Sequence, residues 1–244
     1  MLPYLFDNTD FPSTDLALDE PNGLLAAGGE LSVKRLIQAY SKGIFPWYSS
    51  DEPILWWSPD PRAVFVINEF KTHKSVIKTL KQLDLKVTLN HNFEQVIKHC
   101  SKPRINDDET EGGTWILPEM MKAYIKLHQQ GFAHSVEVWL HGELVGGIYG
   151  VVSGGVFCGE SMFSEISNGS KVALSCLVKY LKQFDFRLLD CQMENSHLNL
   201  LGAINISRKN YLLELNKTEN LKVDSTIWSP QVLSWQQLLI GSKS

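Results

Sequence analysis

The sequence predicts an α+β protein whose main domain is built on a mixed, mostly antiparallel sheet and is preceded by a small N-terminal domain. Residues 135–163 show three apolar or alternating runs separated by short turns, a helical pattern follows at 171–183, and an apolar strand follows at 187–192. Strands joined by tight turns pair antiparallel, whereas a helical crossover favours parallel pairing of the strands on either side of it. The order strand, strand, strand, helix, strand therefore predicts the class.

Composition places the chain among ordinary folded proteins. It has 244 residues, of which 43% are hydrophobic and 20% charged, so a sizeable core is available. The net charge of −4 gives no global basic field, although a local basic patch could still bind nucleic acid. The four cysteines form no C-x-x-C pattern, and neither a signal peptide nor an apolar run of about 18 residues is visible. We expect a cytoplasmic protein without disulfides or a membrane span.

The first sixty residues are rich in Pro, Gly and Trp and contain one short helix. The helix is expected to begin near Glu30–Ser32 and to end at Lys42–Gly43, where a glycine favours termination. The segment Pro59–Pro61 indicates a boundary, since prolines interrupt regular structure. We therefore expect a small N-terminal domain at residues 1–60 and a larger domain at residues 61–244.

An amphipathic helix is expected at residues 70–83. Its lysines recur at spacings of three, four and three, opposite the Val, Ile and Leu residues: Lys71, Lys74, Lys78 and Lys81. Such a row of cations suits the phosphates of a nucleic acid, and a solvated helix face is the alternative interpretation. Further helical patterns lie at 92–100, 118–130 and 198–201.

The central strands are bounded by turn residues. The expected strands are 135–140, 144–152 and 156–163, with turns at His141–Gly142 and Ser153–Gly155. The helix from residue 171 is expected to be capped by Ser167 or Asn168, because short polar side chains satisfy the first backbone N–H groups of a helix.

Three polar residues near the ends of two strands are candidates for chemistry. Glu160 lies in an apolar strand, where a carboxylate is costly unless it has a partner, and alternation places it on the face of Cys158 and Met162. Asp190 and Gln192 are two residues apart and are expected to share a face of the next strand. If the two strands are neighbours, the three groups converge and could hold or deprotonate an ammonium nucleophile. In the alternative interpretation, Glu160 is a strand-end acid paired with a lysine, Asp190 caps a loop, and Gln192 faces water.

Other chemistries are disfavoured. The stretch Phe163–Lys171 has one glycine, and an acid where a coenzyme A site would present backbone N–H groups to pyrophosphate. Cys158 and Cys191 lie in apolar strands and are expected to be buried rather than nucleophilic. The histidines are unclustered, so we expect no metal site.

At these residues the chain resembles the bacterial leucyl/phenylalanyl-tRNA–protein transferases. The resemblance covers roughly residues 10–215 and is carried, in order, by these segments: Glu20–Ala26 with Gly28–Gly29, Gly43–Trp47, Ile54–Arg62, Gly113–Ile116, Phe157–Ser164 and Asp190–Gln192.

The resemblance implies an acetyltransferase-like catalytic domain that needs no metal or cofactor. It also implies transfer of Leu or Phe, and less efficiently Met, from aminoacyl-tRNA to proteins with N-terminal Arg or Lys. The product would carry an N-terminus that marks it for degradation. The implied partners are aminoacyl-tRNA and these acceptor proteins, without a membrane, and a monomer is expected.

The resemblance also implies roles for individual positions. Glu160, Asp190 and Gln192 match residues around the reacting centre, whereas Trp47, Trp115 and Tyr40 match residues at the terminal adenosine of the tRNA. The pocket for the aminoacyl side chain is matched by Ile148, Phe157, Leu174, Leu177 and Leu189. The lysines of the 70–83 helix match basic residues that meet the acceptor stem.

Two features depart from the family pattern. Position 148 is often Met and position 177 can be Phe, whereas here they are Ile and Leu, which leaves the ranking of Leu, Phe and Met open. The segment 106–111 is acidic and longer than expected, and it is interpreted as a solvated loop or as an attractor for a basic acceptor.

The implied reaction is aminolysis of an ester. We expect Asp190 to bind the acceptor ammonium or to remove its proton, Gln192 to orient it, and Glu160 to complement the acceptor's cation. Three alternatives remain at this point: a transferase that uses aminoacyl-tRNA to modify cell-wall peptides, a coenzyme A acetyltransferase, and a tRNA-binding module without catalysis.

Overall fold

The computed structural model describes residues 2–6, 9–102, 116–218, 221 and 224–236. Trp115 and the acidic segment 106–111 lie outside these ranges. Within the described ranges, no helix has both the length and the apolar character needed to cross a bilayer.

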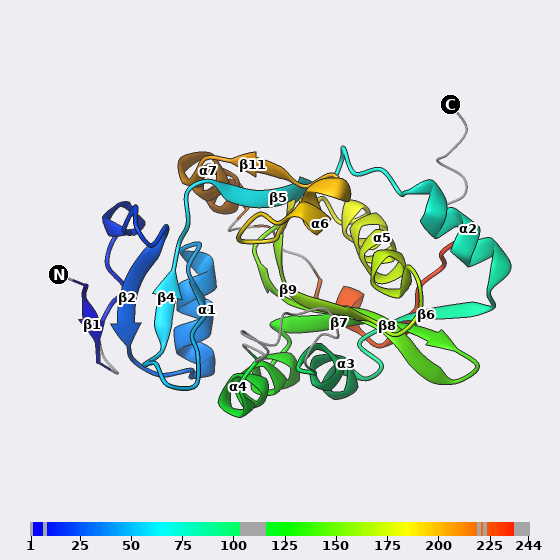
Figure 1. The fold of residues 1–244 in the computed structure, drawn as a ribbon, viewed down its shortest axis with the longest axis horizontal. Helices are drawn as coiled ribbons and strands as arrows, with labels where there is room; N and C mark the ends of the chain where they lie inside the picture. The colour runs from blue at the N-terminus through cyan, green and yellow to red at the C-terminus, as the bar shows by residue number, and fades with distance from the viewer. Residues whose placement is uncertain (1, 7–8, 103–115, 219–220, 222–223, 237–244) are drawn as a thin grey trace.

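A small sheet and one helix form the N-terminal unit, which we define as the elements from β1 to β4 (Figure 1). The sheet order is β1-β2-β4-β3, with β1 at Tyr4–Leu5, β2 at Leu24–Gly28, β4 at Leu55–Trp57 and β3 at Phe45–Pro46. A 3-10 turn, η1, covers Thr14–Leu16. Helix α1, Val33–Ser41, begins where the Ser32 hydroxyl accepts a hydrogen bond from the backbone N–H of Arg35.

The main domain contains an eight-stranded mixed sheet in the order β11-β5-β10-β9-β8-β7-β6-β12. The strands are β5 Arg62–Val66, β6 Leu85–Leu89, β7 Ala133–Leu140, β8 Glu143–Ser153, β9 Val156–Ser164, β10 Leu188–Asp190, β11 Ile204–Ile206 and β12 Gln231–Val232. The β7-β8-β9 meander is antiparallel, and β10 pairs parallel to β9. A meander followed by a helical crossover into a parallel strand is the acetyltransferase-like arrangement that was expected.

Helices cover both faces of this sheet (Figure 1). Helices α3 (Phe93–Cys100) and α4 (Pro118–Gln129) pack on one face, while α2 (Lys74–Gln82) and α5 (Gly169–Lys182) pack on the other. The remaining helical elements are α6 (Ser196–Leu200), α7 (Arg208–Thr218) and the 3-10 turn η2 (Ser225–Trp228). Each face therefore has its own hydrophobic cluster, because the side chains of a strand alternate between the two faces.

The N-terminal unit shares the cluster on the α3/α4 face. Leu36 and Trp56 of that unit belong to the same buried cluster as Phe93 of α3 and Met120 of α4. The two sheets separate between β4 and β5, yet the apolar core is continuous across that point. Because the core is continuous, a boundary between two domains near residue 60 stays a prediction.

Three local expectations were wrong. Helix α5 begins at Gly169, and Asn168 precedes it with a φ of 67° and no side-chain cap; its amide donates instead to Thr79 of α2 at 3.0 Å. Helix α2 begins at Lys74, so Lys71 lies before the helix. Strand β10 ends at Asp190, and Gln192 has a φ of 60°, so strand alternation does not place its side chain.

Candidate active site

A cavity of about 570 Å³ lies where β9 continues past the end of β10. The N-terminal unit supplies one wall through Phe45, Pro46 and Trp47. The main domain supplies the rest, including Glu160 on β9 and the segment Cys191–Leu198. The cavity thus depends on both parts of the chain, since three of its lining residues precede the main sheet.

A β-bulge determines how Glu160 is presented. Tyr149 of β8 lies opposite Ser161, whereas the next residue, Gly150, lies opposite Gly159, so Glu160 is the extra residue in β9. The expectation that Cys158 and Met162 share one face was wrong for this reason. Cys158 packs in the cluster on the α3/α4 face, and Met162 packs against the cluster on the α5 face.

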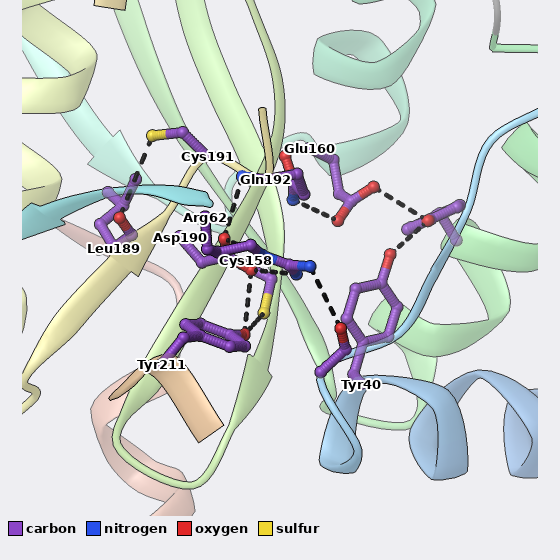
Figure 2. Close-up of polar contacts among 11 residues, drawn as sticks. Tyr40, Arg62, Cys158, Glu160, Leu189, Asp190, Cys191, Gln192 and Tyr211 are labelled. Carbon is purple, nitrogen blue, oxygen red and sulfur yellow. Dashed lines mark hydrogen bonds and ion pairs between the residues drawn. The ribbon is translucent and has the colours of Figure 1, made fainter. Parts of the chain in front are cut away.

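Glu160 is half-buried and holds hydrogen bonds from two other elements (Figure 2). The Tyr124 hydroxyl of α4 donates to its Oε2 at 3.0 Å, and the Gln192 amide Nε2 donates to its Oε1 at 3.3 Å. The Tyr40 hydroxyl of α1 is hydrogen-bonded to that of Tyr124. Burial raises the pKa of Glu160 to about 7, against the opposing effect of the Tyr40 and Tyr124 hydroxyls.

Asp190 is buried in an ion pair with Arg62 (Figure 2). Arg62 donates from Nε to Oδ1 at 2.8 Å and from Nη2 to Oδ2 at 2.7 Å. The Tyr211 hydroxyl of α7 donates to Oδ2 at 3.0 Å. Asp190 and Arg62 are 0% and 1% exposed, and Asp190 is not among the residues that line the cavity.

The Arg62 guanidinium is enclosed by aromatic rings. Its central carbon lies 4.9 Å from the ring centroid of Phe45 and 4.6 Å from that of Tyr211, and its Nη1 donates to the Gly43 carbonyl at 3.1 Å. Burial alone would lower the pKa of Arg62, but the adjacent Asp190 carboxylate outweighs burial and raises it. The guanidinium therefore stays charged and ties the N-terminal unit to β10.

Gln192 owes its position to Asp190. Its backbone N–H donates to Asp190 Oδ1 at 2.9 Å, and its carbonyl accepts from the N–H of Ala63 at 3.2 Å. These bonds hold the residue in its left-handed conformation, which is uncommon for a residue other than glycine. Asp190, Gln192 and Glu160 do come together, but through this turn rather than through a shared strand face.

The apolar side of the cavity contains part of the expected side-chain pocket. Ile148, Leu174 and Leu189 line it. Phe157 and Leu177 do not line the cavity and lie in the hydrophobic cluster on the α5 face, each 1% exposed. Apolar residues that the sequence did not assign to this pocket also line it, among them Phe65, Met162 and Leu198.

The residues expected at the tRNA end have different exposures. Trp47 is 38% exposed at the cavity, and its ring lies 5.5 Å from that of Trp57. Tyr40 is 1% exposed, so it contacts the site through Tyr124 rather than through a free ring face. The side chains of Lys71, Lys74, Lys78 and Lys81 are exposed. Helix α2 lies at the end of the molecule away from the N-terminal unit (Figure 1).

The charge around the cavity is mainly negative. In the described part of the chain, its lining includes two carboxylates, Glu160 and Glu194, and no lysine or arginine. One oxygen of Glu194 accepts from the Asn205 amide, which orients the carboxylate. The described residues contain no cluster of His, Cys, Asp and Glu that could hold a metal ion. Such a surface suits a cationic ligand, because an anion there would be repelled.

Sequence reasoning missed the residues that support the site from other elements. Arg62, Tyr124 and Tyr211 come from β5, α4 and α7, far apart in the chain. Arg62 had one usable signal, since it opens the apolar run Ala63–Val66, where an unpaired cation is costly. The two tyrosines had none, because only tertiary packing brings them to the carboxylates.

Comparisons with known proteins identify the family. The leucyl/phenylalanyl-tRNA protein transferase family model matches residues 64–216, and the N-terminal domain model of the same family matches residues 29–60. A leucyl/phenylalanyl-tRNA–protein transferase of Pseudoalteromonas translucida (strain TAC 125) is 49% identical over 233 residues, covering 95% of this chain and 96% of the relative. The enzyme of the same name from Shewanella woodyi (strain ATCC 51908 / MS32) is 50% identical over 224 residues, covering 92% of this chain and 93% of the relative.

Similarity to solved structures is more distant. The structure of L-PGS from Bacillus licheniformis aligns with a TM-score of 0.40 and 11% identity, covering 71% of this chain and 56% of that one. Trp47 lies in the N-terminal match, and Glu160 and Asp190 lie in the larger one. The chain belongs to the leucyl/phenylalanyl-tRNA–protein transferase family.

Proposed function

We propose that this chain transfers Leu or Phe from aminoacyl-tRNA to the N-terminus of an acceptor protein. The observation that carries the proposal is one cavity with three kinds of surface: an exposed tryptophan at Trp47, an apolar wall around Ile148, and the Glu160–Gln192 pair. These surfaces match the three parts of the reaction, which are an adenosine, an apolar side chain and an ammonium nucleophile. Charged tRNA is a cytoplasmic substrate, so we propose that compartment, and a monomer as the working unit.

Specificity for the transferred amino acid is assigned to the apolar wall. Ile148, Leu174 and Leu189 provide contact area, and Phe157 and Leu177 set the position of that wall from behind. Each buried methylene contributes about 0.8 kcal/mol, which separates Leu from Ala but scarcely Leu from Met. Because buried area does not rank Leu against Met, the proposal that Leu and Phe are good substrates and Met a weaker one rests on the family resemblance.

The tRNA is proposed to bind along the outside of the cavity. The exposed face of Trp47 offers a stacking platform for the terminal adenosine, and Trp115 and Tyr40 are assigned to the same end by the family resemblance. Tyr40 would act by holding Tyr124 and Glu160, since its own ring is buried. The exposed lysines of the 71–81 stretch would meet acceptor-stem phosphates: Lys71, Lys74, Lys78 and Lys81.

The acceptor is proposed to be a protein with N-terminal Arg or Lys, which the transfer marks for degradation. Glu160 and Glu194 make the cavity attractive to a molecule with an α-ammonium and a cationic side chain. Gln192 would orient the α-nitrogen. Asp190 supports the site as a positioning residue, because its Oδ1 accepts the backbone N–H of Gln192.

The test is a transfer assay with two donors. The protein is incubated with labelled Phe-tRNA or with labelled acetyl-coenzyme A, each with an Arg-initiated peptide and with an otherwise identical Ala-initiated control. We expect label on the Arg peptide from Phe-tRNA alone. Transfer from acetyl-coenzyme A alone would identify an acetyltransferase, and tRNA binding without transfer would identify a binding module. Label on the Ala peptide at the same rate would contradict the acceptor assignment.

A further inference from the structure

We propose that Glu160 takes the proton from the acceptor's α-ammonium and returns it to the leaving ribose oxygen, while Arg62 and Asp190 are positioning residues that hold Gln192 against Glu160. This inference rests on the proposed transfer from an aminoacyl ester. The base is then Glu160, which lines the cavity, rather than Asp190, which is buried.

Asp190 is occupied on both oxygens. Its Oδ1 accepts from Arg62 Nε and from the N–H of Gln192, and its Oδ2 accepts from Arg62 Nη2 and from the Tyr211 hydroxyl. The residue is 0% exposed and does not line the cavity, so an acceptor's ammonium does not reach it. Protonating Asp190 would also leave the Arg62 guanidinium buried without its counter-charge, which is costly.

Glu160 has the access that Asp190 lacks. It lines the cavity, and its hydrogen-bond donors, Tyr124 and Gln192, are both neutral, so neither cancels its charge. The pKa of Glu160 is about 7 because burial disfavours the carboxylate. An α-ammonium has a pKa of about 7.7–8.0, so proton transfer between the two groups is close to balance, which favours general base catalysis.

The tyrosine and thiol groups around Glu160 do not compete with it for a proton near neutrality, and two further titratable side chains, Glu194 and His197, line the same cavity. Burial raises the pKa of each neighbouring tyrosine and of the neighbouring thiol, which keeps them neutral, and Arg62 stays paired with Asp190. The facing groups come from six elements: Tyr40 of α1, Arg62 of β5, Tyr124 of α4, Tyr149 of β8, Cys158 of β9 and Asp190 of β10.

The α-ammonium gives one proton to a Glu160 oxygen, and the freed lone pair attacks the carbonyl carbon of the ester. The bond between that carbon and the ribose oxygen then breaks with its electron pair on the oxygen, which takes the proton from the Glu160 carboxyl. The second proton on the nitrogen leaves to solvent as the amide forms, so Glu160 ends ionised.

The positioning role follows from the backbone of the turn. Asp190 Oδ1 accepts the N–H of Gln192, and Ala63, the residue after Arg62, donates its N–H to the Gln192 carbonyl. Arg62 in turn is fixed by the Gly43 carbonyl and by the rings of Phe45 and Tyr211. A change in Arg62 or Asp190 therefore displaces the Gln192 amide from Glu160 without touching the substrate.

The experiment measures single-turnover transfer from Phe-tRNA to an Arg-initiated peptide between about pH 6 and about pH 9. Glu160→Gln keeps the size of the side chain and removes the base, so we expect a loss of at least about a hundredfold near neutrality. The loss should shrink to less than about tenfold near pH 9, where the free amine predominates. Glu160→Asp should keep the wild-type pH profile at a reduced rate, and the exposed Glu143→Gln should match wild type.

The Asp190→Asn variant distinguishes positioning from base catalysis, because it should reduce the transfer rate by the same factor at every pH. A Glu160→Gln loss that does not change with pH, or an Asp190→Asn loss that disappears near pH 9, would overturn the inference. If the wild-type protein transfers nothing from Phe-tRNA, the proposed function falls and the inference with it. If the wild-type protein transfers Phe and the Glu160→Gln variant does so at the same rate, the inference is overturned while the proposed function stands. Thermal unfolding of each variant shows whether a loss comes from misfolding.

Discussion

Arg62 and Asp190 form a two-pronged ion pair, with N–O distances of 2.8 and 2.7 Å, in which both side chains are buried. The pair joins the first strand of the main sheet that the chain enters, β5, to the strand that leads to Gln192. Because Arg62 also donates to Gly43, a single side chain connects the N-terminal unit with the site. Both the stability of the protein and its activity should depend on this contact.

Breaking the pair should destabilise the fold strongly. Arg62→Met leaves Asp190 buried without its counter-charge, and we expect the free energy of unfolding to fall by about 3–5 kcal/mol. The matched control is Lys217→Met, which breaks an exposed pair with Glu214 and should cost less than about 1 kcal/mol. Urea unfolding of the two variants measures the difference. Equal losses would mean that the buried pair contributes no more than a surface one.

Asp190→Asn should reduce turnover far more than tRNA affinity. The amide cannot accept two charge-assisted bonds from Arg62 while still holding the N–H of Gln192, so Gln192 loses its position. The kcat of transfer should fall by about tenfold or more, with the Kd for Phe-tRNA within about twofold of wild type. Asp185→Asn, at an exposed turn before β10, is the control. A variant with wild-type turnover would remove Asp190 from the site.

Trp47→Ala should weaken binding of aminoacyl-tRNA. Loss of a stacking platform for a base costs about 1–3 kcal/mol, so the KM for Phe-tRNA should rise by roughly 5- to 150-fold. Trp47→Phe keeps an aromatic face and should recover most of the affinity. The KM for the acceptor peptide should stay constant in both variants. An unchanged KM for Phe-tRNA in Trp47→Ala would place the adenosine elsewhere.

Ile148→Ala should shift the preference from Leu toward Phe. Ile148 lines the cavity, so truncation removes contact with a Leu side chain and makes room for an aromatic ring. Differences of this kind are worth about 1–3 kcal/mol, and the ratio of kcat/KM for Phe-tRNA over Leu-tRNA should rise about tenfold. Leu177→Ala removes a residue that does not line the cavity and should change the ratio less. A larger shift in Leu177→Ala would contradict this geometry.

Acid should destabilise the protein through His134. This residue is 2% exposed and stacks on Trp228 at 3.8 Å between ring centroids, and burial lowers its pKa from 6.5 to about 3. The unfolded state then binds the proton first, so stability contributed by neutral His134 is present above pH 6.5 and is lost as the pH falls toward 3.

The slope of this loss is about 1.4 kcal/mol per pH unit for one proton. His134→Phe keeps the stacking on Trp228 and should remove that part of the pH dependence, whereas His141→Asn, at the exposed β7–β8 turn, should keep it. Urea unfolding at several pH values measures the slopes. An unchanged slope in His134→Phe would assign the acid sensitivity to other groups.

The local sequence predicted the meander and the crossover. Alternating apolar residues, the His141–Gly142 turn and the long apolar face of α5 specify these elements from neighbouring residues alone. It did not predict β5, β6, β11 and β12, because short strands show too little alternation to be distinguished from loops. It also misplaced the cap of α5, since Asn168 binds Thr79 of another helix rather than its own backbone.

The residues of the candidate site could be named from the sequence, but their relationships could not. Glu160, Asp190 and Gln192 were identified as polar groups at the ends of apolar strands. The crossover helix also predicted that the strands carrying them, β9 and β10, lie side by side. The tertiary structure decided that Glu160 sits on a bulge facing the cavity and that Asp190 is held by Arg62 from 128 positions away. The physical reason is that burial and charge pairing are set by distant segments, which a pattern of neighbouring residues does not contain.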